Sequence, residues 1–596
     1  MSLKINNFDV PVASVTKPGT DLAPYVGFGH AVKELRKGYR QSSNHAAFKA
    51  DTIFEKDIGV PMRDGVKLYC DVFRPAEASK SPAIIMWSPY GKGGNGPHGL
   101  HMLPGRFGVA QERLSGFEKF EGLDPAEWTA RGYAIVNFDL RGSWDSEGVL
   151  PWLGKQDGED GYDAIEFIAK QPWCTGKVAM AGNSWLAMSQ FFIAAARPPH
   201  LVAIAPWEGA TDFYRDTLCR GGVPYPYKQF WKILELTQYG STGVESITQM
   251  LEKHPLFNEY WQDKVVELSN INVPSYVLAS YSTNLHTSGS IRAYKDIGTE
   301  KKWLRIHAKQ EWSDLYSEFS TNDLHKFLDR YCRDVDNGWE STSRVRVSLL
   351  GFNNGFIENI PFDDYPIPEG KVEKFYLHPA GKLSISPPST SYQESYDSSI
   401  TPKFSDNDPE ELVFKYHFTK PAWLAGFSHV TLYVSCEESE EIDVFVQLRK
   451  ADIEGNLPQN MNVPAQDLVP PVESNADIPN SCFYKYLGAP GSLRASHSEG
   501  RLPSGATSLS GVWPQYRHDR ATPVQRGSVV KLDIPIWPAG ITFEQGESLV
   551  IKVSGHPMGM MDFPNMQIPV ENKGRHVIHM GGEHSSHLVV PLLDPR

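Results

Sequence analysis

Cysteine is scarce in this chain: there are six in 596 residues, and they are widely separated. The absence of any C-x-x-C pair argues against a zinc site or a thiol redox motif. Scattered cysteines are typical of free thiols in a reducing compartment, so we expect a cytoplasmic protein. The first residues also lack the apolar stretch of a secretory signal peptide.

Three further features are missing. No run of about 18 apolar residues occurs, so the sequence predicts no membrane-spanning helix. There is no long basic run and the net charge is −13, which argues against nucleic acid as a partner. No histidine–carboxylate cluster has the spacing of metal ligands. We therefore predict no metal, no other cofactor and a small-molecule substrate, and we leave a homodimer open.

Short apolar runs alternate with helical patterns between residues 51 and 342. The runs that predict buried strands are AIIMWSPY (83–90), YAIVNFDLRG (133–142), KVAMAGNS (177–184), LVAIAPWEG (201–209), SYVLASYS (275–282) and KWLRIHA (302–308). This alternation predicts an α/β domain with a parallel sheet and helices on both faces. Functional residues gather at the carboxyl ends of the strands in such sheets.

The flanking segments have a different character. Residues 1–50 are polar without a clear period and are predicted as an irregular extension. Residues 210–272 are helical in period and rich in aromatics, which suggests a cap above the strand ends. From 343 to 596, short β patterns alternate with turn-rich loops, as in an all-β sandwich or jelly roll. Within that part, residues 455–520 are predicted as a long ordered loop packed on the first domain.

GNSWLAM (182–188) has the pattern of a nucleophile elbow. A predicted strand ends at Ser184 and a predicted helix follows, which would expose the hydroxyl in a sharp turn at a helix N-terminus. Gly182 relieves crowding where the strand and the helix approach each other. The common motif has a second glycine two residues after the serine, where this chain has Leu186. We predict Ser184 as the nucleophile.

Several longer motifs occur in order along the chain. They include GVPMRDGVKLYCDVFRP, WSPYGK, FDLRGSWDSEG, APWEGATDFYRD and GSLRASHS, and they extend from about residue 50 to the end. In these motifs the sequence resembles the cocaine esterase and X-prolyl dipeptidyl-peptidase (CocE/NonD) family. The resemblance implies an α/β-hydrolase domain with an inserted helical cap and a C-terminal jelly-roll domain. It also implies two oxyanion donors, the backbone N–H of Trp185 and the hydroxyl of Tyr90.

The catalytic acid and base depart from the family pattern. Thr283 stands where relatives have the aspartate after the seventh strand, and Glu311 stands where they have the histidine after the eighth. His286 lies three residues beyond Thr283. We therefore predict an exchanged triad, in which His286 is the base for Ser184 and Glu311 orients it, because triads are defined by geometry and not by order.

Alternatives remain for both roles. His307 is a second candidate for the base, and Glu208 and Asp314 are further candidates for the acid. The favoured function is a serine hydrolase or acyl-transfer enzyme that acts on an ester, amide or thioester bond through an acyl-enzyme. The alternatives are a lyase-like or cyclising step on a small metabolite, and a non-catalytic binding or scaffold protein on the same fold.

Overall fold

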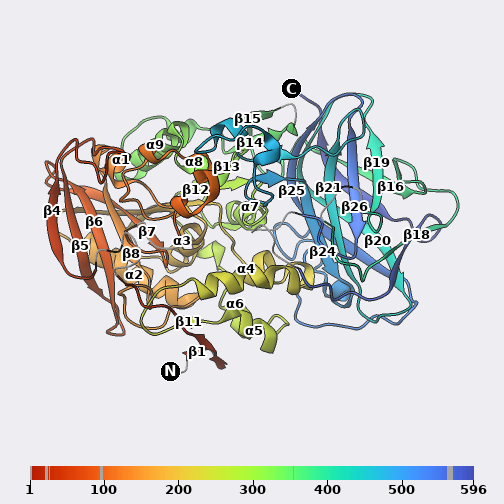
Figure 1. Cartoon of the computed structure of the whole chain (residues 1–596), viewed down its shortest axis with the longest axis horizontal. Helices are drawn as coiled ribbons and strands as arrows, with labels where there is room; N and C mark the ends of the chain where they lie inside the picture. Colours follow the sequence, from red (N-terminus) through yellow and green to blue (C-terminus); the bar gives the residue numbers. More distant parts are fainter. Residues whose placement is uncertain are drawn as a thin grey trace.

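A large open sheet forms the first part of the chain in the computed structural model (Figure 1). The structure describes residues 3–19, 25, 27–93, 98–352, 355–403, 406, 408–559 and 568–596. In order across the sheet, the strands are β4 (Ala31–Leu35), β5 (Thr52–Pro61), β6 (Lys67–Pro75), β8 (Ala134–Asp139), β7 (Ser81–Ser88), β9 (Cys174–Asn183), β10 (Leu201–Trp207), β12 (Ser275–Ser280), β13 (Lys302–His307), β14 (Val345–Leu350) and β15 (Phe356–Phe362). From β8 to β14 all neighbours are parallel. The predicted α/β class is confirmed.

Helices pack against the parallel strands. They are α1 (Pro125–Ala130), α2 (Lys155–Ala169), α3 (Trp185–Ala195), α7 (Thr287–Asp296), α8 (Glu311–Leu315) and α9 (Glu318–Cys332). Helix α3 packs on β7, β9 and β10, and also on α2. All its residues but the last are buried, which explains its nearly continuous apolar sequence, since a helix covered on all sides has no polar stripe.

The segment between β10 and β12, where the sequence predicts a cap, is mainly helical. It contains α4 (Tyr225–Leu236), β11 (Val244–Glu245), α5 (Ile247–Lys253) and α6 (Glu259–Gln262). Helix α4 crosses the lower centre of Figure 1, between the first sheet and the C-terminal strands. Near the N-terminus, β3 (Val12–Ala13) pairs antiparallel with β11, so the N-terminal extension is held against this segment.

The C-terminal part is an all-β sandwich, as predicted, and it lies at the right in Figure 1. Its strands are β16 (Lys371–His378), β17 (Lys382–Ser384), β18 (Tyr392–Asp397), β19 (Leu412–His417), β20 (Ala422–Cys436), β21 (Asp443–Ala451), β24 (Ala489–Arg494), β25 (Val530–Phe543), β26 (Ser548–Ser554), β27 (Arg575–Met580) and β28 (His587–Leu593). The long strand β20 pairs with β25, β27 and β28. Alternate residues Val430, Leu432 and Val434 of β20 are fully buried, as expected for a strand with one face on the core.

Three details differ from the expectations. The extension over 1–50 is not wholly irregular, since β1 (Leu3–Ile5), β2 (Phe8–Val10), β3 and β4 lie in it. Strand β14 was expected in the sandwich, but it pairs in parallel with β13 and so continues the first sheet past residue 343. The segment 455–520 packs on the first domain through stacking of Tyr484 on Phe107, yet it also supplies β24 to the sandwich. Such pairings join residues far apart in sequence, which a local pattern does not reveal.

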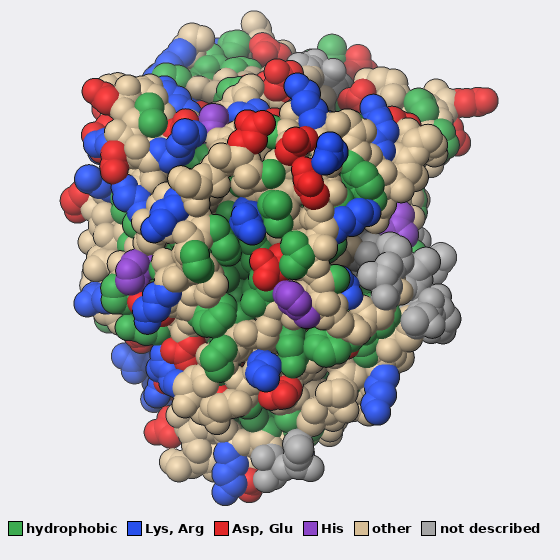
Figure 2. Space-filling view, turned by 90° about the vertical axis from the view of Figure 1, so that its left-hand side faces the viewer, with side chains coloured by type: hydrophobic (Ala, Val, Ile, Leu, Met, Phe, Trp, Pro, Cys, Tyr) green, Lys and Arg blue, Asp and Glu red, His purple; other side chains and the backbone are tan. Residues whose placement is uncertain are grey.

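On the face at the β4–β6 end of the molecule, Figure 2 shows acidic and basic side chains scattered among apolar ones. No large area of one charge sign is visible there among the side chains that are described. None of the described helices is both long and apolar enough to cross a membrane.

Candidate active site

Ser184 stands at the sharp turn between β9 and α3. Its backbone has φ 56° and ψ −115°, a conformation that is unfavourable for a residue with a side chain. The turn is held because the Ser184 N–H donates to the carbonyls of Trp207 and Glu208, at 3.1 and 3.0 Å. At Gly182, where φ is 125°, an added Cβ would lie 2.5 Å from the Leu186 side chain. The segment therefore has the geometry of a nucleophile elbow.

His286 lies beside this serine. It follows β12 and comes directly before α7, and its Nε2 is 3.1 Å from Ser184 Oγ. Burial lowers the pKa of His286 to about 4, although the charge of Glu208 opposes the shift. The imidazole is therefore neutral near pH 7, which is the form that accepts a proton from a serine. The structure brings together the serine and the histidine that the sequence suggested.

Glu311 does not contact His286. As the first residue of α8, Glu311 accepts a 2.7 Å hydrogen bond from Asn183 Nδ2. The Gln310 side chain accepts from the N–H groups of Trp312 and Ser313 and so starts the helix at Glu311, which directs this carboxyl group to Asn183. In the described part of the chain, Nδ1 of His286 has no hydrogen-bond partner. The predicted orientation of His286 by Glu311 is therefore corrected.

Glu208, one of the alternatives for the acid, follows the end of β10. It accepts hydrogen bonds from Ser280 and Thr283, at 2.8 and 2.7 Å, and lies 2.5 Å from His307 Nε2. Burial would raise the pKa of Glu208, but His307 and these hydrogen bonds outweigh that effect and hold it below its usual value. Among the charges that act on His286, that of Glu208 has the largest effect. Glu208 is thus the ionised carboxylate of this site, without a direct bond to His286.

The remaining alternatives belong to an ionic network that includes Glu208. His307 pairs with Glu208 and has a longer contact of 3.9 Å to Asp314. Asp314 receives two hydrogen bonds from the Arg305 guanidinium, and this pairing holds the pKa of Asp314 well below its usual value. No hydrogen bond joins His307 or Asp314 to Ser184 among the described residues. Their geometry fits a supporting ion-pair network.

Both predicted oxyanion donors lie at the serine. Tyr90 follows β7, is buried, and its hydroxyl lies close to the Ser184 side chain. Burial raises the pKa of Tyr90 well above its usual value, so the phenol stays protonated and can donate. Trp185 is the first residue of α3, where backbone N–H groups have no partner within the helix. Its ring centroid lies 6.1 Å from that of Tyr90.

Glu121 is a buried residue that the sequence did not single out. Its backbone has φ 66° and its carbonyl accepts from the Asn183 N–H at 3.0 Å. Its carboxyl group accepts from the Trp312 indole at 3.0 Å and lies close to the backbone N–H of Trp185. A lone glutamate in a loop carries no motif or period, so no sequence signal marks it.

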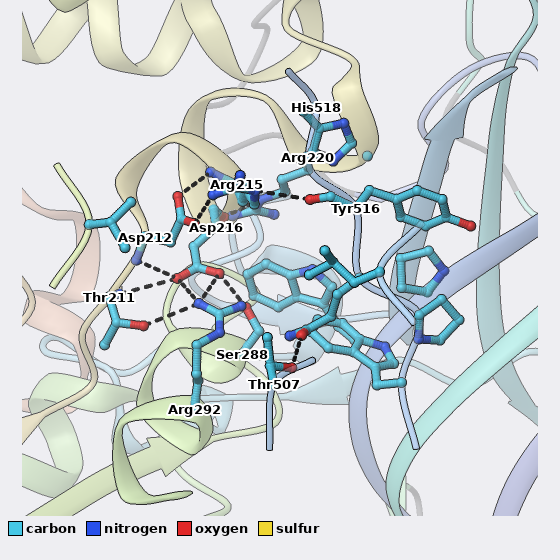
Figure 3. Close-up of a pocket in the computed structure, with 18 of the residues that line it drawn as sticks. Thr211, Asp212, Arg215, Asp216, Arg220, Ser288, Arg292, Thr507, Tyr516 and His518 are labelled. Atoms are coloured by element: carbon cyan, nitrogen blue, oxygen red, sulfur yellow. Dashed lines mark hydrogen bonds and ion pairs between the residues drawn. The ribbon is translucent and has the colours of Figure 1, made fainter. Parts of the chain in front are cut away.

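Two cavities lie near His286 and between the cap and the sandwich. One, of about 90 Å³, is lined by Asn284 and Leu285 just before His286 and by the apolar side chains Phe230, Trp231, Phe445, Met558 and Ile568. The other, of about 560 Å³, is shown in Figure 3. In it, Arg292 pairs with Asp216 and Arg215 pairs with Asp212. Because these charges neutralise each other, the larger cavity is not a simple anion site.

One cluster of described residues has the composition of a metal site. Asp408, Glu411 and His556 lie together in the C-terminal sandwich. The ammonium group of Lys552 already contacts Glu411, so a cation is present there without a metal. The cluster is far along the chain from the elbow, and the expected absence of a metal stays a prediction.

Comparison with known proteins identifies both halves of the chain. Residues 64–244 match the model of the X-Pro dipeptidyl-peptidase (S15) family, and residues 337–589 match that of the X-Pro dipeptidyl-peptidase C-terminal non-catalytic domain. Cocaine esterase of Rhodococcus sp. (strain MB1 Bresler) is 23% identical over 55% of this chain and 63% of its own length. A putative serine esterase of Mycobacterium bovis is 32% identical over 28% of this chain and 26% of its own length. The chain thus matches less than two thirds of the length of these curated relatives.

The similarity to solved structures extends over almost the whole chain. A crystal structure of a CocE/NonD family hydrolase from Staphylococcus aureus is 30% identical, with a TM-score of 0.82, over 96% of this chain and 98% of that one. An α-amino-acid ester hydrolase shares the fold, with 18% identity and a TM-score of 0.65. The fold, the elbow and these matches agree, and the chain belongs to the CocE/NonD family of α/β-hydrolases.

Proposed function

We propose that this chain is a serine hydrolase that cleaves an ester, amide or thioester bond of a small molecule through an acyl-enzyme on Ser184. The observation that carries the proposal is the 3.1 Å contact between His286 Nε2 and Ser184 Oγ, at an elbow of the required backbone geometry. The proposal is also supported by the family, because proteins similar to this chain are named as an esterase and a hydrolase.

The reaction would proceed in two similar steps. Ser184 Oγ bonds to the carbonyl carbon while its proton passes to His286 Nε2, and the carbonyl electrons move onto the oxygen. The N–H of Trp185 and the hydroxyl of Tyr90 then stabilise this oxyanion. When the carbonyl reforms, the leaving group departs with the proton from His286. Water repeats the sequence on the acyl-enzyme and restores the serine.

The acid role is assigned to Glu208 in this proposal. Its negative charge favours the imidazolium that forms on His286, although the two side chains are not bonded. The role is electrostatic. His286 Nδ1 has no hydrogen-bond partner among the described residues, so packing orients the ring. This differs from a triad in which the acid bonds to the histidine directly.

The substrate class follows from the smaller cavity. Its lining includes Phe230, Trp231 and Phe445, which supports an apolar or aromatic acyl or alcohol group. We also propose a cytoplasmic location, since the sequence has only six widely separated cysteines and no C-x-x-C pair.

A fluorophosphonate probe followed by intact-mass measurement tests the proposal. We expect one adduct on the wild-type protein and none on Ser184→Ala. His286→Ala should lower esterase activity by orders of magnitude. A folded His307→Ala variant should lose less activity than His286→Ala, because His307 pairs with Glu208 and not with Ser184. A wild-type protein that neither labels nor hydrolyses a panel of esters would favour the binding or scaffold alternative.

A further inference from the structure

Three buried carboxyl side chains surround the elbow. Glu121, Glu208 and Glu311 are exposed by only 2%, 1% and 3%. Glu208 has His307 as an ionic partner, but no described Lys, Arg or His forms an ion pair with Glu121 or Glu311. A carboxylate that is buried without a counter-ion is strongly destabilising, and such a group takes up a proton instead. Glu121 and Glu311 are therefore present as neutral carboxylic acids.

Glu121 lies close to both oxyanion donors. The backbone N–H of Trp185 is near enough to its carboxyl group to lower the pKa of Glu121, and a charge on Glu121 would raise the pKa of Tyr90. The Trp312 indole fixes Glu121 Oε1 at 3.0 Å. Oε2 is buried and has no hydrogen-bond partner within the described residues. A neutral carboxyl group carries one O–H donor, so this orphan atom needs an acceptor.

Asn183, the residue before the nucleophile, holds both acids in place. Its side-chain amide donates to Glu311 at 2.7 Å and also interacts with Glu121. Burial, reinforced by the charge of Glu208, raises the pKa of Glu121 to about 8. Burial and the charge of Glu208 raise the pKa of Glu311 well above its usual value. Both raised pKa values agree with the lack of an ion-pair partner for Glu121 and Glu311 among the described residues.

We propose that Glu121 is a further catalytic residue, whose carboxylic acid group donates a hydrogen bond to the oxyanion beside Trp185 and Tyr90. Glu311 is a positioning residue that acts through Asn183. The inference rests on the proposed function, since it assigns a third donor to the same reaction. The proton stays on Glu121 throughout, and no bond of that residue forms or breaks. Ionised Glu121 would instead repel the oxyanion, so activity requires its acid form.

The test is the second-order rate of Ser184 labelling by a fluorophosphonate between pH 6 and 10, because the phosphoryl oxygen uses the same donors. We expect the wild-type rate to fall above about pH 8, where Glu121 ionises. Glu121→Leu should label about 100-fold more slowly at pH 7, the loss typical of one oxyanion donor. Glu121→Gln keeps a donor that does not titrate, so it should label within about tenfold of wild type at pH 7 and lack the alkaline fall.

Glu118→Gln is the matched control. Glu118 lies in the same loop and burial also raises its pKa to about 8, but it has no contact with the elbow among the described residues. This variant should keep the wild-type alkaline fall. If Glu121→Gln keeps that fall as well, or a folded Glu121→Leu labels at the wild-type rate, the inference is overturned while the hydrolase proposal stands. A wild-type protein that does not label at all overturns both.

Discussion

Replacing Glu208 by glutamine tests which carboxylate supports the base. The substitution keeps the shape and removes the negative charge that acts on His286. The two side chains form no ion pair within 4.0 Å, and at that distance the Coulomb energy is about 4 kcal/mol for an effective dielectric constant of 20. The interaction energy between the Glu208 carboxylate and the His286 imidazolium is therefore below about 4 kcal/mol. This upper limit corresponds to about a thousandfold in rate. We expect kcat/KM for a 4-nitrophenyl ester to fall between about 10- and 1,000-fold.

Glu311→Gln is the matched comparison. Glu311 is uncharged and its amide substitute can still accept the hydrogen bond from Asn183, so we expect kcat/KM to fall by less than about tenfold. Circular dichroism and thermal unfolding must show that both variants fold, because Glu208 also pairs with His307. If Glu311→Gln loses more activity than a folded Glu208→Gln, the reasoning is refuted and the pairing of Glu311 with His286 that the sequence predicts is restored.

Three further predictions concern stability. Gly182→Ala places a Cβ 2.5 Å from Leu186 at φ 125°, so we expect a loss of about 1–3 kcal/mol or more in urea unfolding; an unchanged midpoint would contradict the elbow geometry. Because the pKa of Glu121 is raised in the folded protein, the native state binds this proton more tightly than the unfolded state. The contribution of Glu121 to the free energy of unfolding is therefore full below about pH 4.5 and declines up to about pH 8. Glu121→Gln should therefore raise the melting temperature relative to wild type more at pH 8 than at pH 5, and an equal shift at both would refute this. Asp314→Asn breaks the buried pair with Arg305 and should cost about 3–5 kcal/mol, whereas a cost below about 1 kcal/mol would indicate a solvated pair.

The fold was largely predictable from local pattern. The strands that end at Ser88, at the elbow and at Trp207 appear as buried apolar runs in the sequence, and each is found in the parallel sheet. Buried strands are recognised clearly because both of their faces must be apolar. The assignment of β14 was less accurate, because its pairing with β13 depends on the course of the intervening chain.

The site was predictable only in part. The elbow at Ser184 has a local signature, and the proximity of His286 followed from the rule that loops after parallel strands meet at one edge of the sheet. The direction of the Glu311 side chain did not follow, since it depends on where Gln310 starts α8. The sequence does not reveal Glu121, because only its surroundings in the folded chain distinguish it from other glutamates.

The sequence by itself determined the elements of this protein: the parallel strands, the elbow serine and the family. It also showed the exchange of residue types in the loops after β12 and β13. These are local features, recorded in periodicity and motif. The tertiary structure decided which charges meet. It pairs Glu208 with His307, leaves His286 Nδ1 without a partner among the described residues, and places Glu121 against Trp185. The ionisation of a carboxyl group depends on burial and on neighbours from distant segments, and only the folded chain defines both.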